Sequence, residues 1–159
     1  MKKYKLTTTE RKIGKTMLYQ IQAIKDFGDV KAGDLGGYIE KEDNLSQEGN
    51  CWIYDNSRAY GNAQVSGDAK VYDKARVYGD AEVYGDASVY GEARVYGKAW
   101  ISGGAKVYDK ARVYGDACVF SKAKVFGEAR VYGEAIVYGK AMVYGKARVY
   151  GKAGIFGEF

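Results

Sequence analysis

Small and branched apolar residues recur at two fixed positions of a six-residue pattern that runs from Ile53 to Gly154. The pattern reads V-Y-G-x-A-x, and its first position is Val or Ile in every repeat except the one that opens at Ala59. The alanine and the next valine are two residues apart, so both point to the same side of a strand. The residue between them and the following tyrosine point to the other side. Each repeat therefore predicts a short strand with alanine and valine facing inward.

The third position of the repeat predicts where the chain turns. This position is mostly glycine, which adopts positive φ without steric cost. Aspartate, which also tolerates the left-handed region, or serine replaces it at Asp55, Asp73, Asp109 and Ser121. A corner after every six residues predicts a triangular coil made of three repeats.

Arginine supports the same coil independently. The sixth position is arginine in every third repeat and in no other, at Arg58, Arg76, Arg94, Arg112, Arg130 and Arg148. A period of 18 residues places all of them on one side of a three-sided solenoid, with neighbours about 4.8 Å apart. The sequence therefore predicts an all-β solenoid of about six coils over residues 53–159.

The repeats VYGDAE, VYGEAR and VYGKAM resemble the hexapeptide repeat of left-handed parallel β-helices. The resemblance covers two thirds of the chain and implies a three-sided parallel β-helix. Its left-handedness is implied by the resemblance alone, because the general rule for crossovers favours right-handed connections. The preceding DFGDVKAGDLGGYIEKEDNLSQEGNCWIYDN resembles the leader of small hexad-repeat proteins of bacteria, phages and prophages, a group without a settled activity.

Residues 1–52 lack the regular repeat and are predicted to be a hairpin and capping segment. KYKLT and MLYQIQAI indicate two strands, joined by the polar TERKIGK. A solenoid needs a cap at its exposed end, and this segment supplies it at the N-terminal side. Ile39 and Leu45 are six residues apart and indicate an early, irregular coil. Two extra residues then separate Leu45 from the register that begins at Ile53.

The net charge, the absence of membrane segments and the cysteines indicate where in the cell the protein is located. The net charge is +5, which is moderate and unlike a polybasic tail. We find neither the apolar core of a signal peptide nor a segment long enough to span a membrane, so no membrane partner is expected. Cys51 is predicted to face inward and Cys118 outward, almost four coils apart and too far for a disulfide. A reducing, cytoplasmic location follows.

The resemblance first suggests an acyltransferase, because many hexapeptide-repeat proteins have that activity. Those enzymes use a histidine as general base, and the γ-class carbonic anhydrases of similar fold bind zinc through histidines. This sequence contains no histidine. The absence of histidine therefore predicts that the chain is not an enzyme and has no catalytic residue, metal or cofactor. A divergent hexapeptide acyltransferase is kept as a remote alternative.

One predicted side of the solenoid, the Arg–Tyr face, pairs each arginine with an aromatic residue two positions later. Guanidinium groups bind phosphate or carboxylate, and aromatic rings stack on bases. The candidate binding residues are Arg76, Tyr78, Arg94, Tyr96, Arg112, Tyr114, Arg130 and Tyr132. Two simpler interpretations stay open: the arginines record duplication of an 18-residue unit, and the tyrosines stack only to stabilise the strands.

A second side, the apolar face, carries apolar residues at outward positions, which is typical of an interface. Its candidate interface residues are Trp100, Cys118, Phe120, Ile136, Tyr138, Phe156 and Phe159. Phe156 and Phe159 belong here because an open last coil would expose strand edges. The third side carries mostly lysines and aromatic residues, with Trp52 and Tyr54 expected to point outward.

These surfaces predict a non-catalytic, self-associating interaction protein that binds another protein. The leader resemblance implies a phage-like origin and an inhibitory action on a host factor. The alternative is a sponge or receptor for a nucleotide or other anionic ligand, which would bind to the Arg–Tyr face.

Overall fold

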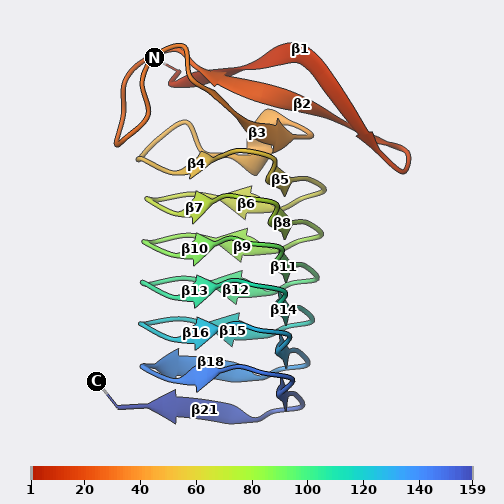
Figure 1. The fold of residues 1–159 in the computed structure, drawn as a ribbon, viewed down its shortest axis with the longest axis vertical. Coiled ribbons are helices and arrows are strands. Elements are labelled where there is room, and N and C mark those ends of the chain that lie inside the picture. Colours follow the sequence, from red (N-terminus) through yellow and green to blue (C-terminus); the bar gives the residue numbers. More distant parts are fainter. Residues whose placement is uncertain (1, 159) are drawn as a thin grey trace.

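Each six-residue repeat forms a short strand and a corner, and three repeats close one coil of a solenoid (Figure 1). The computed structural model describes residues 2–158. About seven coils of parallel strands stack between an N-terminal hairpin and the C-terminal end (Figure 1). The described residues form no α-helix, and the arrangement is consistent with the left-handed β-helix that the resemblance implies.

Three parallel sheets form the sides of the solenoid. The Arg–Tyr face is formed by β5 (Arg58–Ala59), β8 (Arg76–Val77), β11 (Arg94–Val95), β14 (Arg112–Val113), β17 (Arg130–Val131) and β20 (Arg148–Val149). The apolar face is formed by β6 (Gln64–Val65), β9 (Glu82–Val83), β12 (Trp100–Ile101), β15 (Cys118–Val119), β18 (Ile136–Gly139) and β21 (Gly154–Gly157). The third side, called the lysine face, is formed by β4 (Trp52–Ile53), β7 (Lys70–Val71), β10 (Ser88–Val89), β13 (Lys106–Val107), β16 (Lys124–Val125) and β19 (Met142–Val143).

The inward positions build one continuous core. Alanines and valines of the repeat, such as Ala105 and Val107, are fully buried in the central coils. Successive coils are joined by backbone hydrogen bonds, for example from the N–H of Arg94 to the carbonyl of Ala111 at 3.0 Å. The predicted alternation of inward and outward positions is confirmed.

The corners lie where the third position of the repeat predicts them. The residues that replace glycine have φ values of 56° to 60°, at Asp55, Asp73, Asp109 and Ser121. Where glycine is present, tight stacking adds a second reason for it. A Cβ atom on Gly97, whose φ is 65°, would lie 2.8 Å from the backbone nitrogen of Gly115 in the next coil.

An N-terminal hairpin covers the first coil, as predicted (Figure 1). Strands β1 (Tyr4–Ile13) and β2 (Thr16–Ala23) pair antiparallel, and β2 pairs antiparallel with β3 (Leu35–Ile39). β3 runs parallel to β5, so the hairpin extends the sheet of the Arg–Tyr face. The strands are longer than the sequence indicated: most of the expected polar loop is part of β1, because the turn is made at Gly14, with φ of 58°.

The structure adds one coil to the six that were expected. Tyr38 pairs with Arg58, and Leu45 forms a bridge with Val65. The offset between these partners is 20 residues, whereas the later coils repeat every 18. The two extra residues explain why this coil does not continue the regular pattern, although Ile39 and Leu45 mark it.

Trp52 corrects one expected orientation. The repeat places this residue outward on the lysine face, but its side chain is only 1% exposed. The rings of Tyr4 and Phe27 contact the indole edge-on, with centroids 6.0 and 5.2 Å away. The chain before β3 folds over this coil, so a position that the strand turns outward is covered.

Buried polar side chains also distinguish the cap from the coils. The Lys3 ammonium donates to the carbonyls of Cys51 at 2.8 Å and Gly49 at 3.1 Å, and lies 4.6 Å from the ring centroid of Phe27. Burial lowers the pKa of Lys3. Asn44, at the end of the short 3-10 helix η1 (Glu42–Asn44), is also buried.

Both cysteines are free thiols, as predicted, with Cys51 buried and Cys118 half-buried. Across residues 2–158, no helix has the length and apolar character needed to cross a membrane.

Candidate functional site

The Arg–Tyr face carries one arginine on each of six neighbouring strands. The register pairs Arg94 with Arg76 on one side and with Arg112 on the other, and it continues from Arg58 to Arg148. These side chains are half-buried, except that of Arg148, which is exposed. The 18-residue spacing therefore produces an arginine ladder along the solenoid.

The tyrosines two residues after the arginines form a stack beside this ladder. The rings of Tyr78, Tyr96, Tyr114 and Tyr132 have neighbouring centroids 4.9 Å apart, with planes within 4° of each other. Each inner ring lies between two other rings, so its faces contact protein and its edge meets solvent. The stack therefore stabilises the strands, and the arginines are the groups on this face that can bind an anion.

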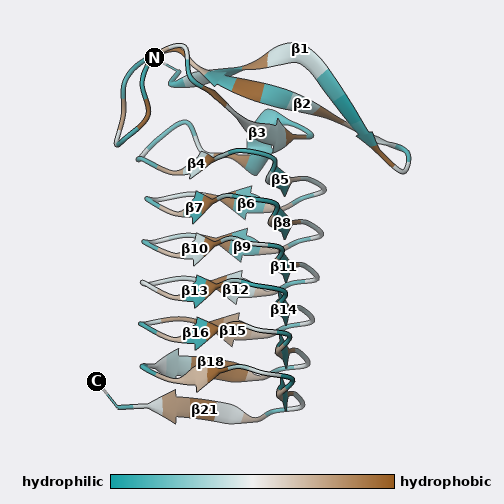
Figure 2. Cartoon of the chain, in the orientation of Figure 1, coloured by the Kyte–Doolittle hydropathy of each residue, from teal (hydrophilic) through white to brown (hydrophobic). Residues whose placement is uncertain are grey.

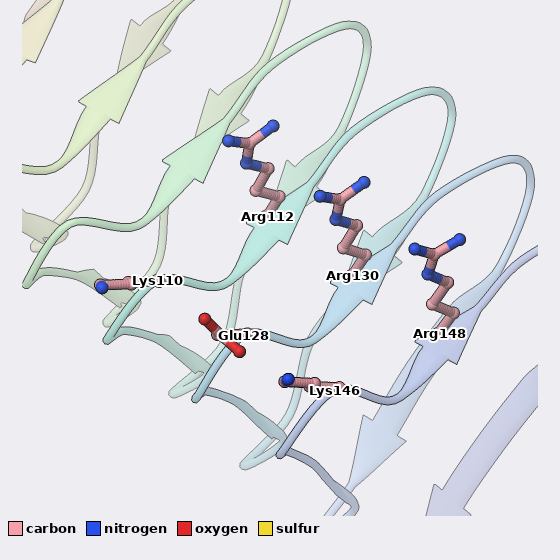
Figure 3. A pocket seen from close by; sticks show the side chains of 6 residues that line it. All are labelled: Lys110, Arg112, Glu128, Arg130, Lys146 and Arg148. Carbon is pink, nitrogen blue, oxygen red and sulfur yellow. The ribbon is translucent and has the colours of Figure 1, made fainter.

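A shallow pocket of about 290 Å³ lies between the arginine ladder and the preceding corner of the solenoid (Figure 3). Its lining residues are Lys110, Arg112, Glu128, Arg130, Lys146 and Arg148. Figure 3 shows the three guanidinium groups projecting in the same direction from β14, β17 and β20, with the other three side chains at the corner. Five cations and one carboxylate give the pocket a formal net charge of +4.

In the described part of the chain, no close ion pair neutralises the arginines of the ladder. The ion pairs there are Lys2–Glu42, Lys31–Asp26 and Lys70–Asp29. Two charges one coil apart repel by about 0.9 kcal/mol in water. An anion between neighbouring guanidinium groups would turn this repulsion into attraction, which makes the pocket a candidate anion site.

The first hairpin strand adds a cation near the other end of the ladder. The guanidinium of Arg11 on β1 lies 4.3 Å from the ring centroid of Tyr38. Burial, and then the positive charges of Arg76 and Arg11, lower the pKa of Arg58. Sequence reasoning missed Arg11, because it lies outside the repeat and only the pairing of β1, β2 and β3 brings it there.

Most of the predicted interface residues lie together on the apolar face. Trp100, Cys118 and Ile136 are in register on β12, β15 and β18. Trp100 is 48% exposed and Ile136 is 40% exposed. Figure 2 shows this face changing from hydrophilic at β6 and β9 to hydrophobic at β15 and β21.

Aromatic rings line one edge of the same face. Phe120 and Tyr138 stack with centroids 5.3 Å apart, and Phe156 lies 4.9 Å from Tyr138. Phe159, the last residue of the predicted interface, lies outside the described residues.

A polar cluster joins the cap to the lysine face. The hydroxyl of Tyr54 donates to Asp29 at 2.8 Å, and Lys70 forms an ion pair with the same carboxylate at 3.7 Å. The hydrogen bond from Tyr54 lowers the pKa of Asp29. These groups satisfy one another, so the cluster fixes the loop that contains Asp29. Between residues 2 and 158, no group of three or more His, Cys, Asp and Glu side chains is placed to hold a metal ion.

No protein-family model matches the chain. The chain is 46% identical over 65 residues to the protein named "Uncharacterized acetyltransferase YdcK" of Escherichia coli strain K12. The match covers 36% of this chain and 20% of that protein, so the chain spans about a fifth of the length of this relative. The repeat, the stacked coils and this likeness together support a hexapeptide-repeat β-helix.

This likeness corrects the prediction that the chain is not an enzyme. A relative that is 46% identical over the matched segment is named an acetyltransferase, which points toward enzymatic activity. The prediction rested on the absence of histidine. Glutamate, aspartate, lysine, tyrosine and cysteine also act as general acids and bases, so the missing histidine removes one base and not the whole class of reaction.

Proposed function

We propose that the protein binds a phosphate-bearing anion and that the pocket formed by Arg112, Arg130 and Arg148 with the corner lysines is the binding site. One observation carries the proposal: the pocket has a net charge of +4, and its arginines have no carboxylate partner at ion-pair distance among the described residues. Such a concentration of charge attracts anions and strengthens each hydrogen bond that they accept.

The geometry of the guanidinium groups favours phosphate. A guanidinium presents its N–H donors as a planar fork that matches two oxygens of a phosphate. Three such forks project in the same direction from adjacent strands (Figure 3). Neighbouring phosphates of a diphosphate or triphosphate can therefore each meet an arginine, while Lys110 and Lys146 add charge at the corner.

The size of the pocket limits what it holds. Pockets for small molecules usually have volumes of about 300–1,000 Å³, and this one, at about 290 Å³, is at the lower limit. It accommodates the phosphate groups of a nucleotide, whereas the base and sugar would lie outside it. The stacked tyrosines already contact one another, so we expect recognition of the phosphates and little selectivity for the base.

The test is a calorimetric titration with ATP and with inorganic triphosphate. The Arg112→Gln, Arg130→Gln double variant should bind both at least about tenfold more weakly, because each lost hydrogen bond to a charged group is worth more than 1 kcal/mol. The matched control is Lys106→Gln with Lys124→Gln, which removes equal charge from the lysine face at the same two coils. This control should bind nearly as well as the natural sequence.

Two results would overturn the proposal. Absence of binding to both compounds would exclude a phosphate site. Equal weakening in both double variants, together with a steep fall in affinity on adding salt, would show attraction to a positive surface without a specific site.

Acetyl transfer is a second candidate, favoured by the likeness to the protein named an acetyltransferase. The assay is release of free thiol from acetyl-coenzyme A in the presence of amine acceptors. Release that requires both the protein and an acceptor would support acetyl transfer. Binding of triphosphate without thiol release would support the anion site alone, so the two candidate functions are distinguishable.

A further inference from the structure

We propose that two copies of the chain form an antiparallel dimer through the apolar face, about a two-fold axis that runs parallel to β15 and passes midway between the two Cys118 residues. The anion site lies on a different side of the solenoid and stays exposed in this dimer. The dimer is therefore independent of the proposed function.

One outward column of the apolar face carries an apolar ribbon over three neighbouring strands. The register places Glu82, Trp100, Cys118, Ile136 and Gly154 in one column across five strands. Within this column the large exposed apolar side chains are Trp100 and Ile136, which lie one coil on either side of Cys118. The ribbon is thus centred on Cys118.

A two-fold axis between the two Cys118 residues makes this ribbon complementary to itself. The axis reverses the order of the coils, so Trp100 of one copy meets Ile136 of the other, and Cys118 meets Cys118. A shallow pocket of about 410 Å³ lies beside Trp100 and Cys118, at the level where Ile136 of the second copy would arrive. The large indole thus faces the smaller aliphatic side chain, with a hollow to receive it.

The charges at the corner that precedes the apolar face favour a second copy of the chain as the partner. The exposed residues of this corner, one for each coil, are Asp80, Lys98, Asp116, Glu134 and Lys152. With an axis parallel to the strands, this corner of one copy faces the same corner of the other copy, with the order of the coils reversed. Lys98 then faces Glu134, and Asp80 faces Lys152. Each pair occurs twice by symmetry, giving four ion pairs.

One contact opposes this arrangement. Asp116 lies at the level of the axis and faces its own copy, which places two carboxylates opposite each other. Lys98 lies one coil away on the same corner and offsets part of this repulsion. Four attractive pairs against one repulsive pair leave the edge of the interface complementary in charge.

The other two-fold arrangement fits less well. An axis along the solenoid would keep coil levels together and would place the leading corner against the aromatic edge. Asp116 would then face Phe120, and Glu134 would face Tyr138. Burying carboxylates against rings without a cation is unfavourable, so the antiparallel arrangement is preferred.

Sedimentation equilibrium over a wide range of protein concentration tests the interface with a charge exchange. Lys98→Glu and Glu134→Lys, made separately, each place like charges opposite each other twice and should weaken the dimer at least about tenfold. The chain with both substitutions restores opposite charges and should regain most of the affinity. Lys106→Glu on the lysine face is the matched control and should leave the dimer unchanged.

Cross-linking reports the position of the axis. Facing residues of packed sheets are about 10 Å apart, too far for a disulfide but within reach of a short bis-maleimide. The reagent should join two chains through Cys118, since Cys51 is fully buried. Moving the thiol to the lysine face, with Cys118→Ser and Ser88→Cys, should reduce the cross-linked product severalfold.

Three outcomes would overturn the proposal: a natural sequence that stays monomeric at high concentration, single charge changes that leave a dimer unaffected, and a double exchange that does not restore affinity. The last of these would leave dimerisation standing and would exclude the antiparallel register. Equal cross-linking from both cysteine positions would also exclude the axis at Cys118.

Discussion

In a central coil, Val107 pairs with Val89 on one side and with Val125 on the other, and the same contact recurs from coil to coil. In the cap, Trp52 contacts Tyr4 and Phe27, two residues outside the repeat, so its surroundings occur once. The coils are therefore held by many equivalent contacts between neighbours, as in other repeat proteins. The cap depends on a few contacts that no other part of the chain can replace.

This difference implies that a substitution in the cap and a substitution in a coil should destabilise different extents of the structure. A cap residue holds segments that are far apart in the sequence, so its loss should expose the first coil. A substitution in a coil should act on the two neighbouring coils. A substitution that points outward from a coil should change stability little.

The largest effect is expected for Trp52→Ala. Removing a fully buried indole from the cap should cost about 3–5 kcal/mol of unfolding free energy. Trp100→Ala, which removes the half-exposed indole of the apolar face, is the control and should cost far less when the protein is monomeric. Denaturant melts at low protein concentration measure both. Similar losses would contradict the distinction between cap and coil.

Ala105→Leu should have the next largest effect. Ala105 is fully buried at an inward corner of a coil, with no space for a larger side chain in the close-packed stack. Overpacking should cost about 1–3 kcal/mol. Its neighbour Lys106, the first residue of β13, is exposed, so Lys106→Leu adds apolar bulk outside and should cost little. A smaller loss of unfolding free energy for Ala105→Leu than for Lys106→Leu would contradict the assignment of Ala105 as inward and Lys106 as outward.

Alkaline pH should destabilise both regions, and the cap more strongly. Burial, then the nearby Glu42 charge, raises the pKa of Tyr4, whereas an unfolded tyrosine has a pKa of about 10. Burial, then Tyr72 and Tyr108, raises the pKa of Tyr90 in a coil to about 12. A raised folded pKa stabilises the fold below pH 10 and loses that contribution as pH rises further, by up to about 1.4 kcal/mol per pH unit.

Melts from pH 9 to above pH 12 should show this loss. Tyr4→Phe and Tyr90→Phe should flatten the pH dependence alike at first, and Tyr4→Phe more strongly above pH 12, because Tyr90 then ionises in the folded protein whereas Tyr4 is still protonated. Equal slopes in the two variants above pH 12 would show that the cap is no more sensitive to pH than the coils.

The smallest effect is expected for Arg94→Ala combined with Arg112→Ala. Both side chains point outward from central coils, and their removal relieves repulsion between like charges. We expect a change within about 0.5 kcal/mol that diminishes as salt is added. Thermal melts at two salt concentrations measure it. A loss of several kcal/mol would mean that the ladder itself holds the coils together.

The regular coils could be predicted from sequence because the same six-residue pattern recurs in every coil. The spacing of Ala105 and Val107 gives the inward side, and φ near 60° at Asp55 and Ser121 agrees with their positions in the repeat. The burial of Trp52 could not be predicted, because it depends on a segment that folds back from outside the repeat. The additional coil was not counted among the regular ones for a related reason: two extra residues between Leu45 and Ile53 break the 18-residue register.

The arginine ladder follows from the 18-residue period, whereas the pocket does not. Arg112 and Arg130 were predicted to share a face, and they do. Lys110 and Lys146 were known only as charges at the corners, and their grouping with the arginines in one hollow depends on side-chain geometry. The hexapeptide resemblance suggested an acyltransferase, but the absence of histidine led to the wrong prediction that the chain is not an enzyme.

The most direct test of an anion site on this solenoid is a magnetic resonance titration that follows the arginine Nε–H signals as triphosphate is added. We expect the signals of Arg112, Arg130 and Arg148 to shift and saturate together, whereas those of Arg58 and Arg76 change little. Shifts of equal size along the whole ladder, or no shift at the three pocket arginines, would contradict it.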